Sequence, residues 1–161
     1  MNIFVTGGTG FIGSYILQAA LAANHLPTAL SREQPNRPRL ESGVQPRWCN
    51  GDLRSLRSDD FEGIETVIHL ASAGVSPKKA SWDELIDTNV SGSLRLLQIA
   101  ADAGVQRFVI AGTCHEYGYA GERFATIPPD APLEPASAYG ASKAAAFHLL
   151  HCLAKERGLE L

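Results

Sequence analysis

A glycine-rich segment, Gly7–Gly13 (GGTGFIG), lies near the N-terminus between an apolar run and a helical pattern. The run before it, residues 3–5, is β-branched and aromatic, which predicts a buried strand. After it, Ile12, Ile16 and Ala20 recur every fourth position, which predicts a helix with one apolar face. A strand, a glycine loop and a helix together hold a diphosphate, because the helix start presents unpaired N–H groups and the positive end of its dipole.

The glycines are spaced Gly7-x-x-Gly10-x-x-Gly13, a variant of the commoner dinucleotide-binding spacing. A glycine triplet alone is weak evidence, because loops are rich in glycine, but the flanking strand and helix strengthen it. The alternative is a tight turn without a ligand. We expect the cofactor to contact this segment, through Gly7, Thr9, Gly10, Phe11, Ile12 and Gly13.

Predicted strands and helices alternate along the rest of the chain. The pattern predicts further strands at 27–31, 47–50, 66–71 and 108–111, and helices at 82–103 and 139–157. Residues 32–46 and 112–136 are expected to be irregular, and a loop as long as the second is usually functional. Apolar strands without alternation indicate a parallel sheet covered on both faces, so we predict one α/β domain with a Rossmann-like, doubly wound sheet.

In such a sheet the carboxyl ends of all strands lie along one edge, where ligands bind. The residues that follow the predicted strands should therefore line one crevice with the glycine loop. These candidate residues are Ser31, Arg32, Asp52, Leu70, Ala71, Ser72 and Thr113.

The end of the second strand is expected to select the cofactor. An acidic residue there binds the ribose of NAD, whereas an arginine accommodates the 2′-phosphate of NADP. Arg32 suits a phosphate and Ser31 can add a hydrogen bond, so we favour NADP over NAD. The alternative is that Arg32 is a solvated surface residue and Glu33 binds the ribose.

Tyr139 and Lys143 are four residues apart on a predicted helix, so their side chains share a face. The lysine charge favours the phenolate, which lets the tyrosine exchange a proton with a substrate oxygen at neutral pH. Such pairs are frequent by chance and usually structural. The dinucleotide loop upstream favours the catalytic interpretation.

Several further motifs occur in order with the glycine loop: Gly51-Asp52-Leu53, His69-Leu70-Ala71, Asn89-Val90-Ser91-Gly92, Thr113-x-x-x-Tyr117-Gly118 and Pro135-x-x-x-Tyr139-Gly140-x-Ser142-Lys143. Together they resemble the extended short-chain dehydrogenase/reductases, specifically the NAD(P)-dependent epimerase/dehydratase group that acts on nucleotide sugars. The resemblance covers the whole chain.

The resemblance implies a role for each matching residue. Tyr139 would be the acid/base, and Lys143 would hold the nicotinamide ribose and lower the tyrosine pKa. Thr113 would hydrogen-bond the substrate oxygen and Asn89 would complete the catalytic tetrad. Asp52 would lie beside the adenine, with Leu53 next to it at the cofactor. Family members pair through helices into a homodimer, so the resemblance also implies a dimer, whereas the small residues near Gly92 and Gly140 could instead pack on the sheet.

The chain departs from the family after Thr113. Dehydratases carry an Asp-Glu pair there, whereas this chain has Cys114-His115. We therefore favour 4-keto reduction or epimerisation over dehydration. His115 is either a second acid/base or a histidine bonded within the loop. Glu116 replaces an apolar residue and is expected to contact substrate or solvent.

Charge and composition exclude other classes. The net charge of −3 is spread along the chain, which argues against nucleic acid as a partner, and no apolar run is long enough to span a membrane. Three scattered cysteines indicate neither a metal site nor a disulfide framework and suit the cytoplasm. The chain ends at Leu161, where another strand would begin, so we expect residues 1–161 to be a cofactor-binding domain without its C-terminal substrate-binding part. The alternative function is a non-catalytic NAD(P)-binding module.

Overall fold

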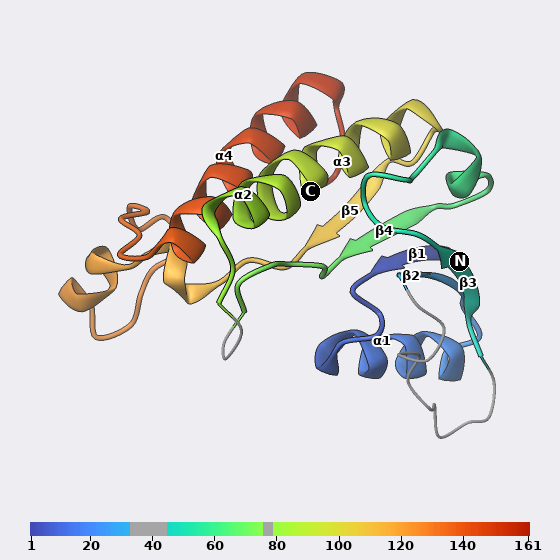
Figure 1. Ribbon diagram of the computed structural model, residues 1–161, viewed down its shortest axis with the longest axis horizontal. Helices are drawn as coiled ribbons and strands as arrows, with labels where there is room; N and C mark the ends of the chain where they lie inside the picture. Colours follow the sequence, from blue (N-terminus) through green and yellow to red (C-terminus); the bar gives the residue numbers. More distant parts are fainter. Residues whose placement is uncertain (33–44, 76–78) are drawn as a thin grey trace.

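The computed structural model of the protein describes residues 1–32, 45–75 and 79–161, and its centre is a five-stranded, all-parallel sheet (Figure 1). The strand order is β3-β2-β1-β4-β5. The strands are β1 (Asn2–Thr6), β2 (Leu26–Ser31), β3 (Arg47–Asn50), β4 (Thr66–His69) and β5 (Arg107–Ile110). All five predicted strands are confirmed, with ends that differ by a residue or two.

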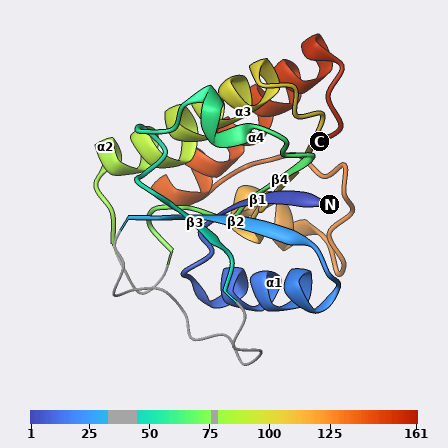
Figure 2. The same ribbon diagram turned by 90° about the vertical axis from the view of Figure 1, so that its right-hand side faces the viewer.

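Helices cover both faces of the sheet, which confirms the doubly wound fold. Helix α1 (Phe11–Ala22) lies on one face, and α2 (Trp82–Leu85), α3 (Ser93–Asp102) and α4 (Ala138–Arg157) lie on the other (Figures 1 and 2). Each face has its own apolar cluster. The smaller cluster centres on Val5 and Leu17 beneath α1, and the larger on Phe4, Leu96 and Leu150 beneath α3 and α4.

The order of the strands reverses at β1, which pairs with β2 on one side and with β4 on the other. Parallel sheets bind ligands at such a switch point, outside the carboxyl ends of the strands. The register places Thr6, the last residue of β1, beside His69, the last residue of β4. The glycine loop and the segment after β4 therefore leave the sheet side by side.

The predicted helix at 82–103 is present but is not a regular α-helix. Residues Ile86–Gly92 form a π-helical segment between α2 and α3. Its wider turn carries Asn89, whose side chain is held by hydrogen bonds to the segment after β4 and to α4. Periodicity of apolar residues does not reveal such a segment, and π-helical turns are frequently found at functional sites.

Helix α4 begins one residue before the predicted start and ends at the predicted residue, and both of its ends are capped. The Oγ atom of Ser137 accepts a hydrogen bond from the N–H of Gly140 at 3.1 Å, which caps the first turn. Gly158 ends the helix with a φ of 66°, a left-handed conformation that favours glycine.

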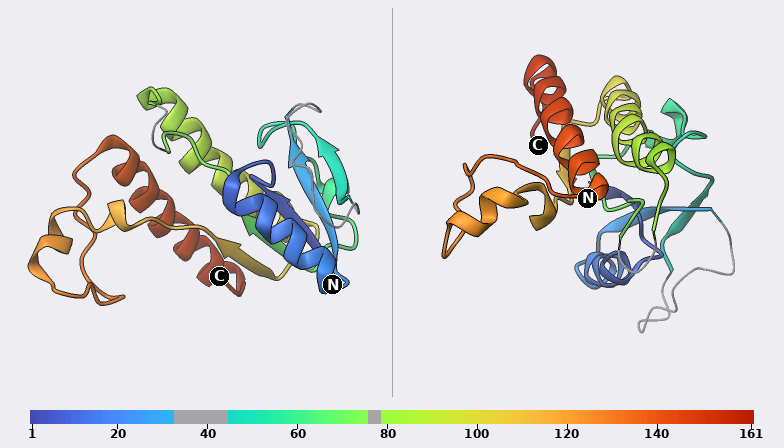
Figure 3. Two further views of the ribbon diagram at one scale, coloured as in Figure 1. Left: turned by 90° about the horizontal axis from the view of Figure 1, so that it is seen from below. Right: turned by 60° about the vertical axis from the view of Figure 1, so that its left-hand side comes forward.

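The segment before α4 extends away from the sheet and contains two short 3₁₀ turns, Cys114–Glu116 and Tyr119–Arg123 (Figure 3). Most of the loop predicted at 32–46 lies outside the described residues. Within residues 1–32, 45–75 and 79–161, no helix combines the length and the apolar character needed to cross a bilayer.

Candidate active site

The glycine loop is packed so closely that side chains are excluded at two of its positions. A Cβ atom on Gly13 would lie 2.1 Å from the carbonyl oxygen of Gly7. A Cβ atom on Gly7, whose φ is +72°, would lie 2.8 Å from the backbone N of Ala71. The loop thus brings backbone, rather than side chains, to the start of α1. A diphosphate needs this arrangement, because it must approach the backbone closely.

The start of α1 is open and carries no competing negative charge. Gly10 precedes the helix, and the first turn contains no acidic residue. Thr9 and Gly10 are exposed, as are Phe11 and Ile12, at 80% and 62%. The first N–H groups of a helix have no partner within it, so this end of α1 can bind an anion.

The ends of β2 and β3 reach the same edge of the sheet. Ser31 is buried and Arg32 is exposed, whereas Glu33 lies outside the described residues. Asp52 is exposed, and its Oδ1 atom accepts hydrogen bonds from the N–H groups of Arg54 at 2.9 Å and Ser55 at 3.1 Å. One carboxylate oxygen of Asp52 therefore holds its own turn.

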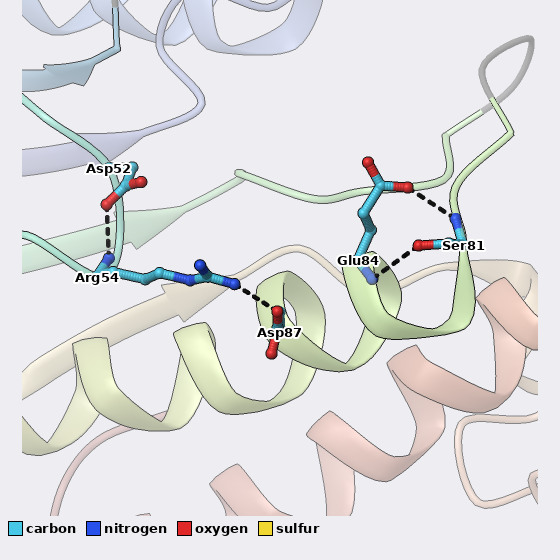
Figure 4. Close-up of polar contacts among 5 residues, drawn as sticks. All are labelled: Asp52, Arg54, Ser81, Glu84 and Asp87. Carbon is cyan, nitrogen blue, oxygen red and sulfur yellow. Dashed lines mark hydrogen bonds and ion pairs between the residues drawn. The ribbon is translucent and has the colours of Figure 1, made fainter.

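A surface ion pair joins this turn to the π-helical segment. The guanidinium of Arg54 donates to the Asp87 carboxylate, and Ser81 and Glu84 cap the start of α2 reciprocally (Figure 4).

Leu53, which the resemblance places at the cofactor, is 7% exposed and packs toward Gly92. Its side chain is part of the core beneath the site.

A buried hydrogen-bonded chain links β1 to β4. The hydroxyl of Thr6 accepts the N–H groups of Leu70 and Ala71, both at 3.2 Å, and lies 2.6 Å from Nδ1 of His69. Nε2 of His69 lies 2.8 Å from Oγ of Ser93. Burial, together with the positive charge of Lys143, lowers the pKa of His69 to about 3, so the ring is neutral at neutral pH.

Asn89 organises the segment after β4. Its Oδ1 atom accepts from the N–H of Ala73 at 2.8 Å and from the hydroxyl of Ser72 at 3.0 Å. Its Nδ2 atom donates to the carbonyl of Ala73 and to the hydroxyl of Ser142 on α4. Asn89, which the resemblance places in the catalytic tetrad, is 1% exposed. All of these hydrogen bonds hold the segment after β4 against α4.

Tyr139 and Lys143 lie on the side of α4 that faces the carboxyl edge. A Cβ atom on Gly74 would lie 3.4 Å from Cδ2 of Tyr139, so the segment after β4 passes beside the tyrosine ring. Lys143 is 6% exposed, and its Nζ atom donates to the carbonyl of Ala111 at 2.7 Å. Burial lowers the pKa of Lys143, while the negative charge of Glu116 raises it.

Thr113 follows β5 and caps the 3₁₀ turn Cys114–Glu116. The Lys143 bond to Ala111 therefore places the ammonium beside the strand end that leads to Thr113. His115 is exposed, and its ring lies 5.9 Å from the ring of Tyr139, edge to face. Glu116 is 6% exposed, so its carboxylate does not lie in open solvent, which was one of its two expected environments.

Sequence reasoning did not predict the roles of two residues of this site, or the burial of a third. Thr6 and His69 form the buried bond between β1 and β4, and Glu116 turns inward beside Lys143. Polar residues at the ends of two strands that are otherwise buried would have indicated the first pair. The described part of the chain holds no group of three or more His, Cys, Asp and Glu residues arranged to bind a metal.

Comparisons with known proteins show the family and the fold of the chain. The profile of the NAD dependent epimerase/dehydratase family matches residues 3–161. The chain is 35% identical over 167 residues to sterol demethylase protein B of Methylococcus capsulatus, covering all of this chain and 49% of that protein. It is 36% identical over 154 residues to a UDP-glucose 4-epimerase of Neisseria meningitidis serogroup A, covering 88% and 45%.

Solved structures show the same relationship. MoeE5 in complex with UDP-glucuronic acid and NAD is 33% identical with a TM-score of 0.80, over 92% of this chain and 48% of that one. TunA, an NAD-dependent NDP-hexosamine 5,6-dehydratase, is 30% identical with a TM-score of 0.80, over 94% and 49%. The chain thus spans about half the length of the relatives it matches.

Proposed function

The chain belongs to the NAD-dependent epimerase/dehydratase family, and from this premise we propose that its protein oxidises and reduces the C4 position of a nucleotide sugar. The observation that carries the proposal is the placement of Tyr139 and Lys143 on α4, at the same sheet edge as the glycine loop. Relatives that act on or bind UDP-sugars support the substrate class. Because the chain spans about half the length of these relatives, we propose the activity for the whole protein.

We propose NAD as the cofactor. The diphosphate would lie on the loop of Gly7 and Gly13, where a Cβ atom would fill the cradle, and at the start of α1. The preference for NADP that Arg32 suggested finds no support in the solved relatives, of which MoeE5 holds NAD. An exposed arginine at the end of β2 is compatible with either cofactor, since its side chain can remain in solvent.

When bound, NAD supplies a hydride acceptor for the sugar carbon. Tyr139, as phenolate, takes the proton from the C4 hydroxyl and returns it when the resulting ketone is reduced. The ammonium of Lys143 stabilises the phenolate. It has three N–H donors, and the Ala111 carbonyl accepts one of them, so others are left for the nicotinamide ribose. The hydroxyl of Thr113 donates to the same sugar oxygen. Asn89 acts as a positioning residue that keeps the segment after β4 against α4.

The test is turnover of UDP-glucose and UDP-glucuronic acid by the full-length protein, with products identified by NMR. Tyr139→Phe should lower kcat roughly 100-fold or more, because the proton transfer loses its acid/base. Tyr119→Phe, on an exposed turn of the segment before α4, is the matched control and should leave kcat unchanged. Full activity in Tyr139→Phe would reject the proposal, and NAD binding without any turnover would favour the non-catalytic binding module.

The products also decide the reaction type. The absence of an Asp-Glu pair after Thr113 favours epimerisation or 4-keto reduction, whereas an unsaturated sugar among the products would show dehydration, as in TunA.

We further propose a homodimer, although Gly140 and Ala144 are buried within the chain itself. Light scattering that finds a monomer at high concentration would contradict the dimer.

A further inference from the structure

Glu116 is a buried carboxylate at the centre of the proposed site. It follows two exposed residues, Cys114 and His115, on a single 3₁₀ turn, yet only 6% of it is exposed. Its Oε1 atom accepts the backbone N–H of Thr113 at 2.8 Å. Burying a carboxylate is costly unless the group is hydrogen-bonded and its charge is compensated, so this position demands a partner.

The partner charge comes from α4. Glu116 and Lys143 line the same cavity of about 330 Å³, whose walls are otherwise largely apolar, including Phe108, Ile110 and Leu150. A low-dielectric surrounding strengthens the interaction between the two charges. The charge of Glu116 raises the pKa of Lys143 and so opposes the effect of burial, which lowers it.

The other titratable groups around Lys143 do not provide this compensation. His69, at the end of β4, has a pKa of about 3 and carries no charge at neutral pH. Tyr139 lies one turn earlier on α4. His151 lines the same cavity, but an imidazole is neutral or positively charged and so supplies no negative charge. Among the described residues, Glu116 is the carboxylate whose charge acts on Lys143.

We propose that Glu116 is a positioning residue that fixes Thr113 through its backbone N–H and keeps the buried Lys143 ammonium charged. One carboxylate then sets two reactive parts of the site: the hydroxyl that binds the substrate oxygen and the cation that stabilises the tyrosine phenolate. The inference rests on the proposed function for the roles of Thr113 and Lys143. Its charge component can be measured without turnover.

Two variants separate the two components. Glu116→Gln keeps an acceptor for the Thr113 N–H but removes the charge, whereas Glu116→Val removes both. In the full-length protein labelled with ¹³C-lysine, the Lys143 signal is assigned by its loss in Lys143→Met and is titrated by NMR. We expect Lys143 to lose its proton at lower pH in Glu116→Gln than in the wild type, while Glu122→Gln, an exposed glutamate in the same segment, causes no shift.

Turnover tests the positioning component. The alkaline limb of kcat/KM should move to lower pH in Glu116→Gln, because Lys143 loses its charge earlier. Glu116→Val should lower kcat by roughly a further tenfold, because Thr113 loses the hydrogen bond that fixes its backbone. Thermal unfolding checks that each variant is folded.

Each outcome has one meaning. An unchanged or higher Lys143 titration in Glu116→Gln overturns the charge component, and equal kcat in the Gln and Val variants overturns the positioning of Thr113. A shifted Lys143 titration together with full activity in Tyr139→Phe would reject the proposed function and leave the Glu116–Lys143 coupling intact. Loss of activity in Tyr139→Phe with no shift in the Lys143 titration would reject the Glu116–Lys143 coupling and leave the proposed function intact.

Discussion

The loop between β1 and α1 is built from closely packed backbone, whereas the site between β4, β5 and α4 is built from buried side chains. In the first region, Gly7 and Gly13 bring main chain within distances that a Cβ atom would prevent. In the second, Asn89, Lys143 and Glu116 are almost fully buried and are held by hydrogen bonds. A diphosphate needs close approach to N–H groups, while proton transfer needs charges and hydroxyls fixed in advance.

Substitutions in the two regions should therefore have different effects on cofactor binding and on stability. Filling space in the glycine loop should remove the cofactor and leave the rest of the fold in place. Removing a side chain from the second region leaves buried groups without partners, so it should also lower the free energy of unfolding.

The largest effect is expected at Gly13. Gly13→Ala places a methyl group 2.1 Å from the Gly7 carbonyl, so the loop must move and its N–H groups no longer converge on the diphosphate. We expect NAD affinity to fall roughly 1,000-fold, measured by calorimetric titration. Gly158→Ala, which meets no atom within 4 Å, should keep wild-type affinity. Normal NAD binding by Gly13→Ala would break the distinction between the two regions.

Removing Asn89 tests the second region. Asn89→Ala leaves the backbone of Ala73 and the hydroxyl of Ser142 without their partners. We expect a loss of about 3 kcal/mol in the free energy of unfolding, measured by urea denaturation. Asn50→Ala, exposed at the end of β3, provides the comparison and should cost less. A loss under about 1 kcal/mol in Asn89→Ala would show that the π-helical segment is held by packing alone.

The buried histidine predicts a pH dependence of stability. The pKa of His69 is lowered from 6.5 to about 3 in the folded chain, so between these values the unfolded chain binds a proton that the folded chain does not. Stability is therefore full above about pH 6.5 and falls as the pH decreases toward 3, by up to about 1.4 kcal/mol per pH unit.

Urea unfolding of the wild type and of His69→Gln, compared over this range, isolates the contribution. The wild type should lose more stability on acidification than the variant, and His148→Gln, exposed on α4, should behave as the wild type. Parallel curves for the wild type and His69→Gln would mean that the ring is accessible to protons in the folded chain.

The smallest effect is expected at the surface, between the turn after β3 and the π-helical segment. The side chains of the Arg54–Asp87 ion pair are 71% and 50% exposed (Figure 4). Arg54→Ala should change stability by less than about 1 kcal/mol, and added salt should reduce the difference. A larger loss in thermal unfolding would show that this pair, and not the buried contacts, fastens the turn after β3 to the π-helical segment.

The same contrast explains what could be predicted from the sequence. The glycine loop, the strands and the extent of α4 depend on neighbouring residues, so local patterns predicted them. The fold class followed from the order of these elements.

The second region depends on contacts between residues far apart in the chain. Thr6 and His69 are 63 positions apart, and Asn89 and Ser142 are 53 apart. Helical spacing predicted the pair Tyr139 and Lys143, and resemblance to the family added Asn89. Only the three-dimensional arrangement shows that Glu116 is buried and lines the same cavity as Lys143.

The most direct test of the account separates cofactor binding from chemistry in one experiment. Full-length protein loaded with NAD is mixed with UDP-glucose, and the near-ultraviolet absorbance of reduced nicotinamide is followed in a single turnover. The wild type should show reduction of bound NAD, while Tyr139→Phe should bind NAD with unchanged affinity and show reduction roughly 100-fold slower or more. Equal rates of reduction in the two proteins would contradict the assignment of proton transfer to the buried side-chain region.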